Sequence, residues 1–182
     1  MKAIAKFIYF KVLGWKIVGN TNFSKDTVKK AVIIAAPHTS WHDFFIGLYL
    51  RKITGVKTNF IAKKELFKWP FNYYFKSIGG RAVDRTSGQN KVEAIASLFD
   101  GEEEFRLTLA PEGTRKKVDE WKTGFYYIAK AANVPIIMFT LDFQNKKNKI
   151  SEPFYPTDDK EADFKVMHSF FEAVIGKVPK YS

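Results

Sequence analysis

A histidine and an aspartate lie five residues apart directly after a short apolar run. The run is Ala31–Ala36, it is closed by Pro37, and the two side chains are His38 and Asp43. Inside one continuous helix this spacing would place them about 140° apart. At a strand-to-helix junction the aspartate can instead fold back toward the imidazole. An aspartate that accepts from one ring nitrogen leaves the other free to take a proton, so the pattern indicates an acid–base pair.

The same residues also have a purely structural interpretation. Ser40-x-x-Asp43 resembles a capping box, in which the acid only satisfies an amide at a helix start. His38 would then be a histidine at a strand end, and the pair alone leaves both interpretations open. His38 and His42 are four apart, but threonine stands at position 39 and Pro37 keeps His38 outside the helix. We therefore expect no metal site.

Two further groups of polar residues follow glycines or a predicted strand. The segment Gly79–Arg85 joins two glycines to Arg81 and Arg85, whose fork-shaped guanidinium groups suit phosphate. Its alternative is a turn with a surface ion pair between Asp84 and an arginine. After the next predicted strand lie an acid, a flexible turn, a hydroxyl and an arginine: Glu112, Gly113, Thr114 and Arg115. An ordinary polar turn is the alternative here.

Apolar runs and turn signals place these groups on alternating strands and helices. Strands are expected at 31–36, 56–62, 81–83, 105–110, 134–141 and 150–154. Helices are expected at 1–19, 41–52, 64–75, 87–99, 121–132 and 160–175. This alternation predicts one α/β domain over residues 1–182, with a mixed, mostly parallel sheet covered by helices. Catalytic groups in such sheets collect at the carboxyl ends of strands, which is where His38 falls.

The first 19 residues predict an amphipathic, basic helix. Lys2, Lys6, Lys11 and Lys16 recur every four or five positions among apolar and aromatic residues, and no acid interrupts them. Such a helix suits the plane of a membrane interface. It could equally be a first helix that packs on the domain with solvated lysines, and both interpretations can hold together.

The charge is strongly polarised along the chain. Residues 1–76 carry 14 Lys and Arg against three acids, whereas residues 77–182 carry 16 of each, so the net +11 comes from the first part. This implies an anionic partner: lipid headgroups, nucleic acid or an acidic carrier protein. The sequence contains no recognised nucleic-acid motif, and residues 1–19 are too apolar for a basic arm. We therefore expect an anionic membrane surface and no nucleic acid.

The absence of cysteine and of long apolar runs excludes several kinds of site and segment. The chain contains no cysteine, which excludes disulfides, thiolate metal sites and a cysteine nucleophile. It shows no signal peptide and no run of 18 apolar residues. We expect a protein that is peripheral to the cytoplasmic face of a membrane.

In order and spacing, four blocks of this sequence resemble the motifs of the glycerolipid acyltransferase superfamily, of the lysophosphatidic-acid acyltransferase type. The blocks are His38-x4-Asp43, Gly79 to Asp84-Arg85, Glu112–Arg115 and Val134-Pro135-Ile136. They lie within about residues 30–140, the motif-bearing core.

The resemblance implies a reaction and roles for the residues. His38 would be the general base on an acceptor hydroxyl, and Asp43 its orienting partner. The hydroxyl would attack the thioester of acyl-CoA or acyl-carrier protein, with no other cofactor. The acceptor's phosphate or polar head would be bound by the second and third blocks: Arg81, Arg85, Glu112, Gly113, Thr114 and Arg115.

The acceptor is a separate question. The resemblance favours 1-acylglycerol-3-phosphate, in phospholipid biosynthesis. The chain is short for such an enzyme, which leaves another lyso-lipid acceptor open, and the basic first part also fits a non-catalytic protein that binds anionic lipid. Acyl chain length, the choice between CoA and carrier protein, and the oligomeric state are not determined by the sequence.

Overall fold

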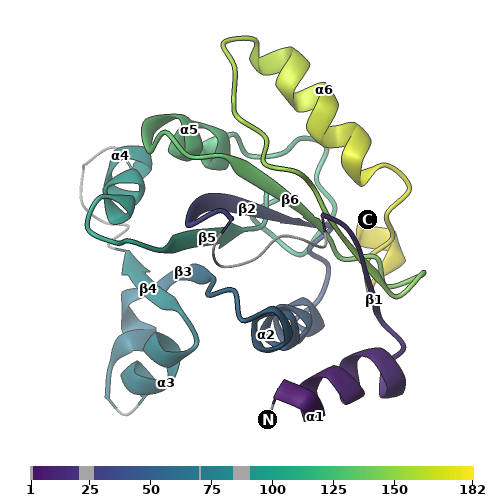
Figure 1. The fold of residues 1–182 in the computed structure, drawn as a ribbon. Coiled ribbons are helices and arrows are strands. Elements are labelled where there is room, and N and C mark those ends of the chain that lie inside the picture. The colour runs from purple at the N-terminus through teal and green to yellow at the C-terminus, as the bar shows by residue number, and fades with distance from the viewer. Residues whose placement is uncertain (1, 21–26, 70, 84–90) are drawn as a thin grey trace.

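Seven strands form one sheet in the centre of the molecule (Figure 1). The structure is a computed structural model that describes residues 2–20, 27–69, 71–83 and 91–182. The sheet order is β1-β7-β6-β2-β5-β3-β4, and only the β6–β7 pair is antiparallel. The strands are β1 Lys16–Gly19, β2 Lys30–Ala36, β3 Asn59–Lys63, β4 Gly80–Val83, β5 Phe105–Leu109, β6 Ile136–Thr140 and β7 Lys147–Ile150. This confirms the predicted α/β class with a mixed, mostly parallel sheet.

Helices cover both faces of the sheet. They are α1 Lys2–Phe7, α2 His42–Thr54, α3 Phe71–Ser77, α4 Lys91–Ala96, α5 Gly124–Ala131 and α6 Lys160–Phe171. Short π or 3-10 turns add η1 Ile8–Val12, η2 Lys64–Phe67, η3 Ser97–Phe99 and η4 Pro179–Tyr181. In Figure 1, α1, α2 and α3 lie on one side of the sheet, with α1 and α3 beneath opposite edges, and α4, α5 and α6 lie on the other.

The central strand β2 supplies side chains to both layers. Val32, Ile34 and Ala36 belong to the main buried core, together with residues of α5 and α6. Ile33 and Ala35, which alternate with them, point to the side of α2. This period of two is the reason why one apolar run can be buried on both faces of a sheet.

The N-terminal segment is shorter as a helix than predicted. Helical structure ends at Val12, and residues 16–19 form β1, which pairs in parallel with β7. Gly14 has a φ of 71°, a left-handed conformation that ends a helix and that glycine adopts without steric cost. The prediction of one helix to residue 19 was therefore wrong in its last third, because the edge of the sheet offers the backbone a second set of partners.

The strand predicted at 150–154 was largely wrong, because β7 spans Lys147–Ile150 and only Ile150 is shared. The remaining boundaries differ less. The predicted helix at 64–75 is divided into η2 and α3, and the helix predicted at 87–99 is described only from Lys91 onward. No helix in the described ranges is long and apolar enough to cross a bilayer.

Candidate active site

The turn between β2 and α2 brings the predicted acid–base pair together. Nδ1 of His38 lies 2.8 Å from Oδ2 of Asp43. The aspartate side chain is buried, whereas that of the histidine is 27% exposed. With the proton on Nδ1 donated to the carboxylate, Nε2 is left as an acceptor for a proton from a substrate.

Asp43 also has the structural role considered for it. Its Oδ2 accepts from the backbone N–H groups of Thr39, at 3.0 Å, and Ser40, at 2.9 Å. One carboxylate oxygen therefore receives three donors, two from the helix start and one from the imidazole. The other oxygen, Oδ1, is buried and has no hydrogen-bond partner among the described residues. Asp43 thus makes the backbone contacts of the capping interpretation and the imidazole contact that the acid–base interpretation requires.

His42 belongs to a different group of side chains. Its Nδ1 lies 2.8 Å from Oγ of Ser40, and its ring stacks on Trp41 with 4.0 Å between the centroids. Trp41 occupies the cap position of α2 and makes no side-chain capping hydrogen bond. Among the described residues no group of three His, Cys, Asp or Glu side chains could hold a metal ion.

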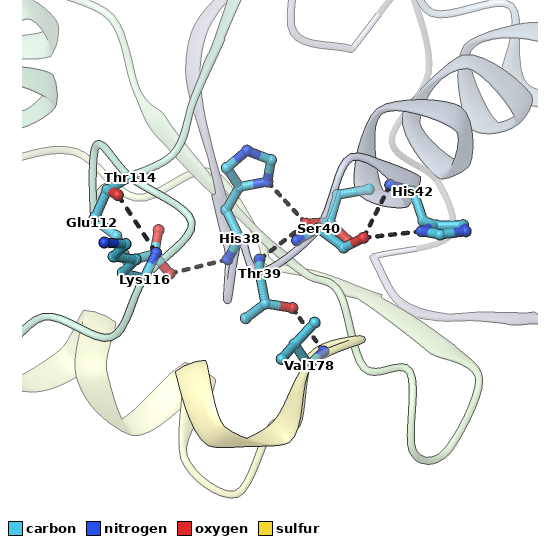
Figure 2. Close-up of polar contacts among 9 residues, drawn as sticks. His38, Thr39, Ser40, His42, Glu112, Thr114, Lys116 and Val178 are labelled. Carbon is cyan, nitrogen blue, oxygen red and sulfur yellow. Dashed lines mark hydrogen bonds and ion pairs between the residues drawn. The ribbon is translucent and has the colours of Figure 1, made fainter.

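Glu112 lies on the other side of His38. Its Oε1 accepts from the backbone N–H of His38 at 3.1 Å, as Figure 2 shows. The residue is only 8% exposed, and this burial raises the pKa of its carboxyl above the ordinary value. Its second oxygen, Oε2, is buried without a hydrogen-bond partner in the described part of the chain. The third sequence block therefore contacts the first directly.

The loop that follows Glu112 carries four exposed cations: Arg115, Lys116, Lys117 and Lys122. Gly113 has a φ of 65°, and a Cβ added there would lie 2.8 Å from Nζ of Lys122, so the lysine side chain crosses this turn. The backbone N–H of Lys122 donates to the carbonyl of Pro111 at 2.9 Å, which closes the loop. Arg115 is exposed on the same loop.

Lys122 was not predicted as a site residue. The chain has 30 Lys and Arg residues, and Lys122 is one of them, near the start of a predicted helix. Only the fold brings its side chain over Gly113. Thr114, which was predicted, is exposed and accepts a hydrogen bond from the backbone N–H of Lys116 at 3.4 Å.

The second sequence block is not brought to this site by its described residues. The guanidinium of Arg81 pairs with Glu102 and lies 5.8 Å from the ring centroid of Phe105. Because Phe105 is the first residue of β5, this guanidinium points to the amino end of the sheet, whereas His38 follows the carboxyl end of β2. Arg85, with Asp84, lies outside the described residues.

The glycines of that block serve close packing of the backbone. A Cβ on Gly79, whose φ is 97°, would lie 2.2 Å from the carbonyl oxygen of Thr58. It would also meet the guanidinium of Arg51, which donates to the carbonyls of Thr58 and Ile78. Gly79 therefore lets the turn before β4 approach the residue that precedes β3. The ion pair considered for Asp84 lies outside the described residues.

An apolar cavity opens beside His38 and Asp43. It has a volume of about 280 Å³ and lies between α2 and the sheet. Its walls are mainly aliphatic and aromatic, with contributions from Ile33, Ala35, Phe44, Leu50, Ile137 and Phe139. Predominantly apolar walls with a few convergent polar groups are typical of small-molecule sites.

Comparisons with known proteins identify the family and a similar fold. The family model described as Acyltransferase matches residues 15–141, which confirms the resemblance noted in the sequence. The fold is similar to a crystal structure of the 1-acyl-sn-glycerophosphate (LPA) acyltransferase PlsC from Thermotoga maritima, with a TM-score of 0.60 and 22% identity. That match covers 93% of this chain and 74% of the other. No curated protein matches the sequence.

Proposed function

Because this chain belongs to the acyltransferase family, we propose that it moves a fatty acyl group from a thioester to the hydroxyl of a lysophospholipid-like acceptor. The donor is acyl-CoA or acyl-carrier protein, and the first candidate acceptor is 1-acylglycerol-3-phosphate, in phospholipid biosynthesis. The observation that carries the proposal is the hydrogen-bonded pair of His38 and Asp43 at the wall of an apolar cavity. No cofactor beyond the thioester donor is needed for this chemistry.

The reaction follows from what the two side chains can do. Nε2 of His38 takes the proton of the acceptor hydroxyl as that oxygen attacks the thioester carbon. The tetrahedral intermediate then breaks its C–S bond, and the imidazolium returns the proton to the departing sulfur. The carboxylate of Asp43 stabilises the imidazolium and holds its orientation. The substrate supplies the nucleophile, so no serine or cysteine nucleophile is required.

The apolar cavity supports a fatty acyl group as the transferred unit. A chain bound between α2 and the sheet gains about 0.8 kcal/mol for each CH₂ group removed from water. His38 and Asp43 line the same cavity, so a chain inside it would have its carbonyl end within reach of the imidazole.

The loop after β5 supports a polar, phosphate-bearing acceptor head. Arg115 and Lys122 are exposed cations on this loop, and arginine and lysine are the usual ligands of phosphate. Glu112 accepts from the backbone N–H of His38, so this loop lies beside the proposed base. We assign the head group to this loop and leave Arg81 out of it.

We also propose peripheral attachment to the cytoplasmic face of a membrane through α1 and η1. Ala5 and Tyr9 are buried in the core against α2, while Ile4 and Phe7 are more than half exposed among lysines. Apolar side chains flanked by lysines suit the interface of an anionic bilayer.

An acceptor screen tests the proposal. One acyl-CoA is offered with 1-acylglycerol-3-phosphate, other lysophospholipids and amino-acid-containing lyso-lipids, and free CoA is measured. We expect wild type and His42→Ala to release CoA with one acceptor class and His38→Ala to release about 10²–10⁴-fold less. His42→Ala is the matched control, because the ring of His42 contacts Ser40 and Trp41 and does not line the cavity. Binding of lysolipid by wild type without CoA release would identify a lipid-binding protein instead.

A further inference from the structure

Four aromatic side chains between β3 and β4 are strongly exposed. They form, with two lysines, what we call the α3 surface: Trp69, Phe71, Tyr73, Tyr74, Lys68 and Lys76. The four aromatic residues are 82%, 64%, 74% and 54% exposed, in that order.

Packing of the domain does not account for these rings. Helix α3 contains four aromatic residues among seven and buries none of its residues. A helix on the surface of a globular domain normally turns its apolar side chains to the core. Contiguous exposed apolar surface marks a site of contact with another molecule or with a membrane.

The residue types identify a lipid surface as the partner. Trp, Tyr and Phe with flanking lysines are typical of the water–bilayer interface, where a ring can be half buried and an ammonium group can meet a lipid phosphate. Protein–protein interfaces are also rich in aromatics but are depleted in lysine. Among the described residues from 65 to 77, Glu65 is the one acid, so the charge of the α3 surface complements an anionic bilayer.

The position of the surface agrees with this partner. In Figure 1, α3 and α1 lie on the same side of the sheet, beneath opposite edges, with α2 between them. Both carry exposed apolar and aromatic side chains among lysines, since α1 exposes Ile4 and Phe7. Two contacts on either side of α2 would fix the tilt of the molecule on a bilayer, which one short helix cannot do.

We propose that the α3 surface is a second membrane-docking site, which inserts its rings at the headgroup level of an anionic bilayer. This deepens the proposed function and rests on the peripheral attachment stated there. Together with α1 and η1, it turns the α2 side of the domain toward the lipid.

Binding to vesicles of phosphatidylglycerol and phosphatidylcholine tests the proposal with the full chain. We expect Phe71→Ser/Tyr73→Ser to lower the partition constant at least tenfold without a change in thermal unfolding, because both side chains are exposed. The matched control is Tyr127→Ser/Tyr155→Ser, two exposed aromatics outside the α3 surface, which should bind like wild type. A loss of less than twofold, or an equal loss in both doubles, would overturn the proposal.

Tryptophan fluorescence gives a second, local measurement. Lipids brominated near the headgroup should quench wild type, and the conservative Trp69→Phe should lower that quenching while vesicle binding persists, although the exposed Trp41 can contribute a remainder. Quenching that is unchanged in Trp69→Phe would show that this side chain stays in water. If Phe71→Ser/Tyr73→Ser instead converted a dimer to a monomer and left vesicle binding intact, the α3 surface would be a protein interface and our proposal would be wrong.

These outcomes are separable from failure of the proposed function. Transfer measured without vesicles, from a short-chain acyl-CoA to a monomeric acceptor, should be equal in wild type and Phe71→Ser/Tyr73→Ser. If wild type itself transfers nothing, the proposed function fails, while the vesicle and quenching results still decide the role of the α3 surface.

Discussion

One carboxylate connects the local fold to the proposed chemistry. Oδ2 of Asp43 accepts from two backbone amides at the start of α2 and from the imidazole of His38. The two backbone amides therefore fix the position of the Asp43 carboxylate, and this carboxylate in turn orients the imidazole ring of His38. A pair built in this way is positioned before any substrate binds, which is the condition for an effective general base.

The dual role of Asp43 predicts a difference between two substitutions. We expect Asp43→Ala to lower both transfer activity and stability, the latter by about 1–3 kcal/mol, because two helix-start amides and the imidazole lose their acceptor. His38→Ala removes a partly exposed ring and should lose activity with little change in stability. Urea unfolding beside the CoA-release assay measures both. Equal stabilities of the two variants would contradict the capping role.

Burial of Glu112 predicts a pH-dependent stability. Burial raises the pKa of Glu112 above its ordinary 4.5, so the folded protein holds this proton more tightly than the unfolded chain. The buried charge then costs stability above the raised pKa, and the cost disappears as pH falls to the unfolded value. Glu112→Gln keeps an oxygen that can accept from the N–H of His38 but carries no charge.

We therefore expect the Tm of Glu112→Gln, relative to wild type, to be higher at about pH 8 than at about pH 4. Thermal unfolding followed by circular dichroism at both pH values measures this difference. A difference in Tm with the opposite pH dependence would show that the charged carboxylate is the form the fold stabilises.

At the scale of elements, two segments far from the motifs hold the site. The N-terminal α1 and η1 pack on α2 through the buried Tyr9, whose hydroxyl donates to Asn148 of β7. The C-terminal segment contacts the turn that carries His38, since the backbone N–H of Val178 donates to Oγ1 of Thr39 at 3.1 Å (Figure 2). The position of α2, and with it that of Asp43, thus depends on both ends of the described chain.

The outer side of α1 gives a prediction for membrane binding. We expect Ile4→Ser/Phe7→Ser to weaken binding to anionic vesicles while the Tm stays near that of wild type, because both side chains are exposed. Deleting residues 1–18 would be a poorer test, because it also removes the buried Tyr9 and Trp15. Co-sedimentation with vesicles measures the effect, and unchanged binding would leave docking to the α3 surface.

The C-terminal segment packs closely on the turn that carries His38, so an added methyl group can test this contact. A Cβ on Gly176 would lie 2.6 Å from Oγ1 of Thr39 and 3.2 Å from Pro37. We expect Gly176→Ala to cost about 1–3 kcal/mol of stability, as overpacking does, and to lower the rate of transfer by moving the turn. Gly101→Ala, where an added Cβ meets nothing within 4 Å, is the control. A wild-type rate for Gly176→Ala would separate this segment from catalysis.

For the whole molecule, the uneven distribution of charge along the chain can be related to one side of the sheet. The net +11 belongs to residues 1–76, which include α1, α2 and α3, the three helices on one side of the sheet (Figure 1). These three helices carry Lys2, Lys6, Arg51, Lys52 and Lys76 against the acid Asp43, so the side with the exposed aromatics has helices of net positive charge. In the proposed attachment, attraction to an anionic bilayer and insertion of apolar side chains would act on the same face.

The presence of basic and exposed apolar side chains on the same side predicts how binding to anionic vesicles responds to salt. We expect affinity for anionic vesicles to fall steeply as ionic strength rises from about 0.05 to about 0.5 M, because the Debye length shortens to a few ångströms. Residual binding from the inserted rings should remain at high salt and should be lost in Phe71→Ser/Tyr73→Ser. Flotation of vesicles over a salt series measures both parts, and a salt-independent affinity would rule out the electrostatic part.

The sequence by itself determined the α/β class and the family, and it identified His38 and Asp43 as the central pair of the candidate site. The alternation of apolar runs is local, so it predicts strands and helices, and the six residues from His38 to Asp43 form their contact across one turn. The tertiary structure alone decided β1, whose partner β7 lies more than 120 residues away. It also placed Lys122 over Gly113, turned Arg81 to Glu102, and left the rings of α3 exposed. Where a long side chain points depends on neighbours distant in the chain, and the spacing of residues in a sequence does not specify those neighbours.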